Sequence, residues 1–166
     1  MYLKRAKDLV SLLRSPRARC RVGILLLAPE DCGKEHDLAA RLGVGTADYL
    51  ALLIESLPTG ARFADITAAR EEARLNELAM KASEHDCTLV FNLDVALARL
   101  SSPERAELWA NLYSRFPHRP NALILGVPAS GKGLLPTGEA LTAWVNENRV
   151  VEVEVQPDQE EGGSGA

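Results

Sequence analysis

An uninterrupted apolar run of strand length, Val22–Leu27, constrains the fold of this chain more than any other feature. The run is far shorter than the roughly 18–20 apolar residues that a membrane-spanning helix requires. It also lacks the polar–apolar alternation of a strand with one exposed face. A run of this kind is typical of a central parallel strand that helices cover on both faces. We therefore expect an α/β protein with this segment as a central strand.

Further strands are expected on either side of it in the sheet. Residues 88–92 and 122–125 are two more short runs that read as buried strands. Residues 150–155 alternate Val with Glu, which is typical of a strand at a sheet edge with one face exposed. Little sequence is left for a strand near Val44, so any strand there must be short.

Helical patterns separate these strands. The spacing of apolar residues predicts helices over residues 3–13, 34–42, 46–57, 67–83, 101–116 and 139–145. Thr46, Thr67 and Ser101 are the expected N-caps. In the 46–57 helix, the residues expected to face the core are Tyr49, Leu50, Leu53, Ile54 and Leu57. Because strands that alternate with helices pair in parallel through right-handed crossovers, the sequence predicts a three-layer α/β/α sandwich with a mostly parallel sheet.

Length and composition fit one domain in a soluble protein. We assign residues 1–155 to a single domain with a basic N-terminal helix, and residues 156–166 to a disordered acidic tail. Hydrophobic residues make up 46% of the 166 residues and charged residues 25%, which is ordinary for a globular protein. The three cysteines, Cys20, Cys32 and Cys87, lack CxxC spacing and favour a reducing compartment. No membrane segment is expected, and the sequence predicts a cytoplasmic protein.

The charge is distributed unevenly along the chain. Residues 4–21 carry seven Lys and Arg residues against one acidic residue, Asp8, whereas the C-terminal segment is acidic. Such a basic arm is either a solvated surface or a site for nucleic-acid phosphates or an acidic partner. No aromatic residues lie between these arginines, so a stacking platform for single strands is not expected.

Residues 28–35 have the spacing of a phosphate-binding loop, GxxxxGK(S/T). They follow a buried strand and precede a helix, so backbone N–H groups and the helix dipole could hold phosphates, with a lysine reaching the outer ones. The candidate nucleotide-binding residues are Ala28, Asp31, Cys32, Gly33, Lys34 and Glu35. Ala28 replaces the usual first glycine, and Glu35 replaces the hydroxyl residue that binds Mg²⁺. The alternative is a strand–turn–helix that keeps the shape and has lost tight binding.

A carboxylate that ends a neighbouring strand could complete such a site. Asp94 is the candidate catalytic and metal-binding residue, because a carboxylate at the carboxyl end of a parallel strand can hold Mg²⁺ or orient the attacking water. Asn92 stands where a metal-orienting aspartate is expected. The alternative role for Asp94 is the N-cap of a helix over residues 95–100.

Three other groups are candidates for this chemistry. Residues 126–133 match the loop spacing a second time but open no helix, so we expect a mobile loop whose Lys132 could point into the same site. Arg149, and less specifically Arg115 and Arg119, could act as an arginine finger in a neighbouring subunit. Cys32 could have a lowered pKa at the helix N-terminus, or be a passive small residue.

Taken in order, these parts resemble the P-loop ATPase core of the AAA+/RecA-like group. More narrowly, they are similar to the small stand-alone P-loop proteins (BrxF) of type 3 BREX bacteriophage-exclusion systems. The resemblance spans about residues 20–155 and is carried by Gly33, Lys34 and the strand end at Asp94. It implies ATP as ligand, Mg²⁺ as cofactor, and partners within a multi-protein antiphage complex that acts on DNA. Ala28, Glu35 and Asn92 depart from the active pattern.

Two functions follow. The first is an ATP-binding accessory protein, with or without weak ATPase activity, in a bacterial defence complex. The second is a pseudo-ATPase that keeps the fold as an assembly module and docks a partner through its basic N-terminus or acidic tail. Direct DNA contact through residues 4–21 and self-association into a homo-oligomer are further expectations.

Overall fold

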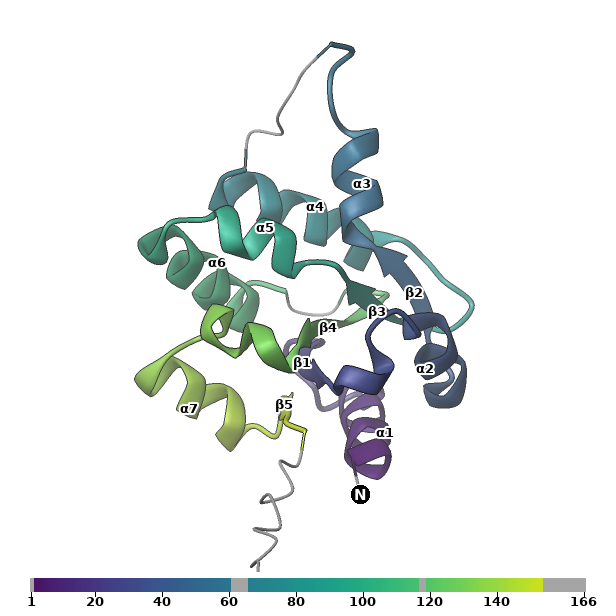
Figure 1. Cartoon of the computed structure of the whole chain (residues 1–166). Coiled ribbons are helices and arrows are strands. Elements are labelled where there is room, and N and C mark those ends of the chain that lie inside the picture. The colour runs from purple at the N-terminus through teal and green to yellow at the C-terminus, as the bar shows by residue number, and fades with distance from the viewer. Residues whose placement is uncertain (1, 61–65, 117–118, 154–166) are drawn as a thin grey trace, which may run out of the picture.

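The fold is a five-stranded, all-parallel sheet between two layers of helices (Figure 1). The computed structural model describes residues 2–60, 66–116 and 119–153. The strands lie in the order β2-β3-β4-β1-β5. Their bounds are β1 Val22–Leu27, β2 Gly45–Asp48, β3 Cys87–Phe91, β4 Ala122–Pro128 and β5 Val150–Val151. The predicted α/β/α sandwich is therefore confirmed, with Val22–Leu27 between two neighbours.

The helices divide between the two faces of this sheet. Helices α1 (Tyr2–Arg14) and α2 (Glu35–Leu42) cover one face, and α4 (Ala68–Met80), α5 (Asp94–Arg99), α6 (Ser102–Ser114) and α7 (Gly138–Asn146) cover the other (Figure 1). Helix α3 (Tyr49–Glu55) stands at the β2 edge. Two short 3₁₀ helices, η1 (Pro29–Asp31) and η2 (Ala129–Leu134), follow β1 and β4.

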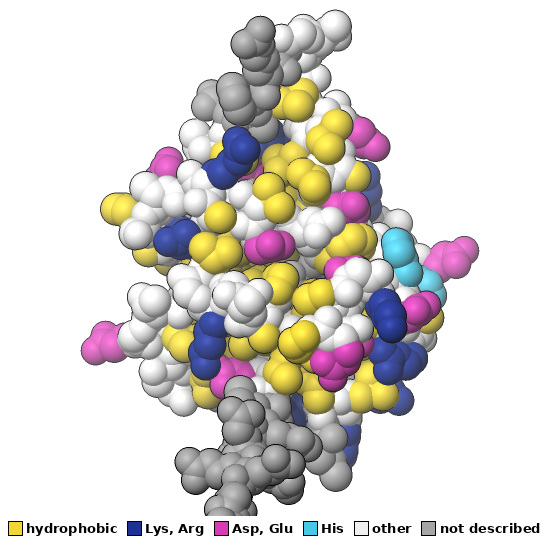
Figure 2. All heavy atoms as spheres, in the orientation of Figure 1, with side chains coloured by type: hydrophobic (Ala, Val, Ile, Leu, Met, Phe, Trp, Pro, Cys, Tyr) yellow, Lys and Arg dark blue, Asp and Glu magenta, His cyan; other side chains and the backbone are white. Residues whose placement is uncertain are grey.

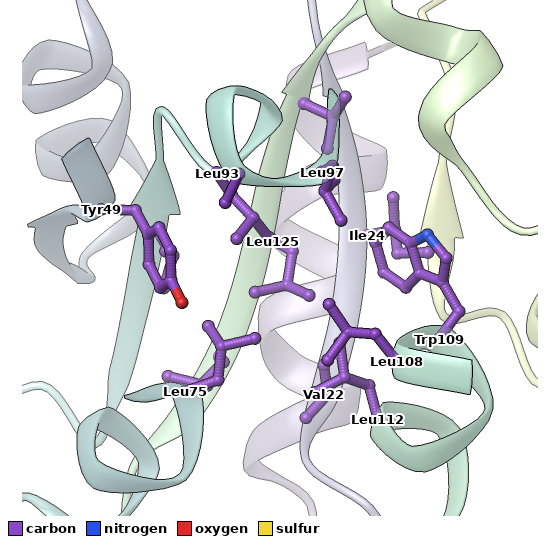
Figure 3. Packing of buried hydrophobic residues seen from close by; sticks show 14 of the residues in the cluster. Val22, Ile24, Tyr49, Leu75, Leu93, Leu97, Leu108, Trp109, Leu112 and Leu125 are labelled. Atoms are coloured by element: carbon purple, nitrogen blue, oxygen red, sulfur yellow. The ribbon is translucent and has the colours of Figure 1, made fainter. Parts of the chain in front are cut away.

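Alternate residues of the central strands supply both cores. Val22 and Ile24 point toward α6 and α7, and Leu25 and Leu27 point toward α1 and α2, as expected for a strand buried on both faces. Figure 3 shows the first core, in which Leu108 and Trp109 of α6 pack against β1. Each buried aliphatic side chain of this kind contributes about 1.5–3 kcal/mol relative to exposure.

Two of the three expected N-caps are confirmed. The Thr67 side chain accepts a hydrogen bond from the Arg70 N–H at the start of α4, and Ser101 accepts one from the Glu104 N–H at the start of α6. The third is wrong, because Thr46 lies inside strand β2, which pairs with β3. The carboxylate of Asp48 caps α3 instead, accepting from the N–H groups of Leu50 and Ala51.

The short helix α3 also differs in the residues that it buries. Tyr49 and Leu53 lie in the core as expected, but Ile54 is 59% exposed. The helix begins three residues later than predicted and projects beyond the β2 edge (Figure 1), so it has no layer to pack against on that side.

Two predicted strand ends shift. Strand β4 continues to Pro128, past residue 125, because it pairs with β1 as far as Leu27. Strand β5 pairs with β1 at the edge of the sheet as expected, but of the predicted residues 150–155 it covers Val150–Val151, and residues 154 and 155 lie outside the described part. The expected acidic tail over residues 156–166 lies outside the described residues. In the described part of the chain, no helix combines the length and the hydrophobicity that crossing a membrane requires.

Candidate phosphate-binding site at the carboxyl edge of the sheet

Parallel strands end together at one edge of the sheet, which we call the carboxyl edge. The residues that follow β1, β2, β3 and β4 therefore share a rim there, the usual place for a ligand in an open α/β sheet. The loop at residues 28–35, the Asp48–Asn92 pair, Asp94 and the turn η2 all follow these strand ends.

The loop after β1 has the backbone needed to turn from strand to helix. Ala28 has a φ of −61°, so an alanine fits where the motif has glycine. Gly33 has a φ of +83°, a conformation that favours glycine. Helix α2 then starts at Glu35 and ends at Gly43, which adopts the left-handed conformation of a C-cap. The predicted strand–turn–helix is thus present.

The loop uses three of its N–H groups internally. The Asp31 N–H donates to the Ala28 carbonyl, 2.9 Å away, and the Lys34 N–H donates to the Asp31 carbonyl, also 2.9 Å away. The Gly33 N–H donates to the Glu35 side chain, with 3.0 Å between nitrogen and Oε1. A phosphate-binding loop needs N–H groups that point at the ligand, so this conformation offers fewer donors than the motif requires.

The hydrogen bond from the Gly33 N–H to Glu35 bears on whether the loop can bind phosphate. An amide that binds a phosphate oxygen can bind a carboxylate oxygen in the same way. The side chain that replaces the Mg²⁺-binding hydroxyl therefore places an anionic oxygen on a loop amide. A bound triphosphate would have to displace that carboxylate or lie beside its charge.

Lys34 and Asp31 occupy different surroundings. Lys34 is exposed, and no hydrogen bond or ion pair of its side chain is found among residues 2–60, 66–116 and 119–153. Asp31 is buried and pairs with Arg41 of α2 at 3.1 Å. Lys34 thus has the position expected of a phosphate-binding lysine, whereas the Asp31 carboxylate is directed toward α2.

Cys32 lies on the loop surface with a thiol pKa above its ordinary value. Partial burial raises the pKa most, followed by the negative charges of Glu35, Asp31, Asp94 and Glu30. The lowered pKa expected from the helix N-terminus is therefore wrong, because burial and the surrounding carboxylates both disfavour the thiolate. The same contributions show that Asp94 lies close enough to the loop to act on it electrostatically.

Two residues, Asn92 and Asp94, follow β3 at the place where a metal-binding acid is expected. Asn92 has a φ of +61° and donates through its side-chain amide to Oδ1 of Asp48, 2.9 Å away. Asp94 is the first residue of α5, and Leu93 precedes it as the cap, so the N-cap alternative for Asp94 is wrong. Asp94 follows the end of β3, a strand that β4 separates from β1, and its charge reaches the loop at Cys32.

Asp48 is a rim residue that the sequence analysis missed. The predicted 46–57 helix includes it, because Gly45–Asp48 is only partly buried and has no apolar run that would mark a strand. No group of three or more His, Cys, Asp or Glu side chains in the described part of the chain is arranged to hold a metal ion. Asp94 stays the predicted Mg²⁺ ligand, a role in which a carboxylate acts together with the phosphate oxygens of a bound nucleotide.

The second loop is ordered and points elsewhere. Residues expected to form a mobile loop instead continue β4 and then form η2, which is anchored where the Trp109 indole N–H donates to the Leu134 carbonyl at 2.9 Å. Lys132 pairs with Glu152 beyond β5 at 3.7 Å, and both side chains are largely exposed. Lys132 therefore reaches the β5 side of the rim.

Arg149 lies at the opposite edge of the sheet, just before β5. Its side chain is 6% exposed, stacks on the rings of Trp144 and Tyr113, and donates to the carbonyl of Val22 at 2.9 Å. An arginine finger has to project from the surface to reach a neighbouring subunit. The buried position of Arg149 contradicts that expectation and gives the residue a packing role.

Much of the basic N-terminal arm is engaged within the molecule. Arg14 donates to Asp86 and to the carbonyls of Gly43 and His85, and Arg21 donates to the carbonyl of Leu13. These contacts fasten α1 to the loops around it. On the face shown in Figure 2, basic and acidic side chains are interspersed with hydrophobic ones.

Comparison of the chain with protein-family models, with curated proteins and with solved structures gave no significant match.

Proposed function

We propose that this chain is a pseudo-ATPase, a P-loop-like domain that serves as an assembly subunit of a cytoplasmic antiphage defence complex in bacteria. The observation that carries the proposal is the hydrogen bond from the Gly33 N–H to the Glu35 carboxylate at 3.0 Å. The loop keeps its strand–turn–helix geometry, but its own carboxylate takes the position of a phosphate oxygen. The defence setting is supported by the resemblance to the BREX P-loop proteins.

Hydrolysis of ATP would also need groups that this rim lacks. Phosphoryl transfer depends on a metal ion held by a loop hydroxyl and an acid, and on a residue that orients water. Glu35 supplies no hydroxyl, and Asn92 supplies a neutral amide that is already bonded to Asp48. Asp94 would be left as the single carboxylate for both roles. The acids around Lys34 would further oppose the approach of a triphosphate.

A second candidate function is ATP binding without turnover. The exposed Lys34 side chain favours it, because it is placed after Gly33 as in an active loop. In that case Mg²⁺-ATP displaces the Glu35 carboxylate, and Lys34 contacts the outer phosphates. The two candidates differ in one measurable quantity, the affinity of the wild-type chain for Mg²⁺-ATP.

Isothermal titration calorimetry with Mg²⁺-ATP separates them. We expect no saturable heat from the wild type at millimolar nucleotide, and measurable binding by Glu35→Thr, which frees the Gly33 N–H and restores the motif hydroxyl. Glu30→Thr is the matched control, because it removes the same charge from an exposed loop position that holds no loop amide. Saturable binding by the wild type that Lys34→Ala abolishes would replace the first function by the second.

A further inference from the structure

A concave site lies at the amino edge of the sheet, opposite the loop at residues 28–35. The groove has a volume of about 820 Å³. Its walls come from the end of α1, the connection from α1 to β1, the end of α6 and the segment before β5. The segment between α7 and β5 contributes Glu147 and Arg149 to the lining.

The base of the groove is a preorganised polar cluster. Glu147 receives a hydrogen bond on each carboxylate oxygen, from the Tyr113 hydroxyl at 3.0 Å and from Arg149 at 2.8 Å. The hydrogen bond from Arg149 lowers the pKa of Glu147 most, and Arg19 adds to the effect through its charge. The Glu147 side chain is 49% exposed, so its remaining lone pairs can accept peptide N–H groups.

The rim of the groove carries surplus positive charge. Glu147 compensates Arg149, and this leaves Arg17 and Arg19, which are both exposed lining residues. No side-chain hydrogen bond or ion pair within 4.0 Å is found for either arginine in the described part of the chain. Two exposed guanidinium groups beside a concave surface are suited to carboxylates, which arginine binds in a bidentate manner.

The remaining wall of the groove is apolar. Leu12 and Ala18, both partly exposed, line it, and the fully buried Leu13 lies behind this surface. An apolar wall beside two arginines fits a peptide that carries both apolar and acidic side chains. A nucleic-acid backbone offers no apolar side chains that could pack on this wall. The chemistry of the lining therefore favours a peptide over DNA.

We propose that this groove binds an acidic, apolar-bearing peptide segment of a partner protein, with Arg17 and Arg19 pairing with its carboxylates. The inference rests on the proposed function as an assembly subunit and names the surface and the chemistry of the partner. In this proposal the recognition element is the short stretch Arg17–Arg19, and the rest of the basic arm takes no part in binding.

Selection from a yeast-displayed library of random peptides tests the proposal. We expect the full chain to enrich peptides that combine Asp or Glu with Leu, Val or Ile, and the Arg17→Glu/Arg19→Glu variant to bind them at least about tenfold more weakly. Lys4→Glu/Lys7→Glu is the matched control, since both lysines are exposed on α1 outside the groove lining. Absence of acidic enrichment, or an equal loss in both variants, would overturn the proposal.

Protection of Cys20 locates the bound peptide. Cys20 lines the groove, Cys32 lies in the loop at the carboxyl edge of the sheet, and Cys87 is buried. In a Cys32→Ala background, we expect a saturating selected peptide to slow alkylation of Cys20 severalfold, and an unchanged rate would place the peptide elsewhere and refute the site. Duplex DNA that binds this groove more tightly than the peptide would also refute it. ATP calorimetry is independent of these results, so binding of ATP would overturn the pseudo-ATPase function without altering the peptide outcome.

Discussion

The side-chain amide of Asn92 donates to the Asp48 carboxylate across the ends of β3 and β2, with 2.9 Å between Nδ2 and Oδ1. The same Asp48 oxygen accepts from the N–H groups that begin α3. The amide thus joins a strand end to a helix cap at the place where an active P-loop ATPase would need an acid. Asn92 has a structural task that an aspartate could not perform.

Replacing Asn92 with Asp tests this task. Asp tolerates the left-handed backbone of residue 92 nearly as well as Asn, so the change isolates the charge. We expect a loss of about 1–2 kcal/mol in the free energy of unfolding at pH 7, because a hydrogen bond becomes a repulsion between carboxylates. The loss should shrink below about pH 4, where carboxyl groups take up a proton.

The exchange Asp48→Asn/Asn92→Asp is the control for that variant. It restores one amide and one carboxylate, and Asn caps helices about as well as Asp. Urea unfolding should therefore return most of the lost stability. If the double variant is as unstable as Asn92→Asp, the charge pair is not the cause.

The buried hydrogen bond between Tyr49 and Glu71 should contribute more to the free energy of unfolding than the exposed one between Tyr113 and Glu147. Glu71 is fully buried, accepts from the Tyr49 hydroxyl and pairs with Arg74. Burial, with the neighbouring carboxylate, raises the pKa of Tyr49, so the hydroxyl remains a donor. We expect Tyr49→Phe to cost about 1–3 kcal/mol, since a buried carboxylate loses a partner.

Tyr113→Phe is the matched control, because it removes a tyrosine–glutamate hydrogen bond of 3.0 Å at the surface. Its cost should stay below about 1 kcal/mol. Thermal or urea unfolding of the two variants measures the difference. Equal losses would mean that burial of Glu71 does not set the energy.

The loop carboxylates should make Cys32 a slow nucleophile at neutral pH. Its pKa is raised by partial burial and then by Glu35, Asp31, Asp94 and Glu30, so the thiolate fraction at pH 7–8 is smaller than for an ordinary thiol. Alkylation by iodoacetamide should therefore accelerate with pH over a higher range than in a free cysteine. In a Cys20→Ser background, Glu35→Gln should shift the profile to lower pH, and Glu77→Gln, on the outer face of α4, should leave it unchanged. Cys87 should not react in the native state, because burial raises its pKa to about 12.

The sequence was sufficient for the architecture because the strongest patterns lie in the most buried elements. Val22–Leu27 reads as an uninterrupted apolar run because both faces of β1 are covered, and the capping residues Thr67 and Ser101 mark the starts of α4 and α6 by local hydrogen bonds. Strand β2 was hidden because Gly45–Asp48 is only partly buried and carries no apolar run. Its strand conformation comes from pairing with β3, a long-range contact that local patterns do not contain.

The sequence predicts where along the chain the candidate site lies, but not which side chains contact one another there. The spacing placed Gly33 and Lys34 correctly after β1, but it could not show that Glu35 folds back onto the Gly33 N–H. Arg149 reads as an exposed charge next to a strand, whereas the structure buries it beneath Trp144 and Tyr113. A buried arginine leaves no periodic signal, since its partners are mostly main-chain carbonyls.

Arg149 should be among the most important charged residues for stability. Its guanidinium donates to the Val22 and Tyr113 carbonyls at 2.9 and 3.1 Å and pairs with Glu147. The guanidinium carbon Cζ lies 4.2 Å from the centroid of the Trp144 ring. Arg149→Met keeps most of the volume but leaves buried carbonyls without donors. We expect a loss of about 2–4 kcal/mol in the free energy of unfolding.

Lys132→Met provides the comparison, because Lys132 and Glu152 form an ion pair with side chains 63% and 44% exposed. Exposed pairs of this kind contribute about 0–1 kcal/mol, so this variant should unfold near the wild-type urea midpoint. A midpoint for Arg149→Met close to that of Lys132→Met would show that the buried contacts carry little energy. That result would contradict the packing role of Arg149, and the predicted role at an interface with another subunit would again be the explanation to test.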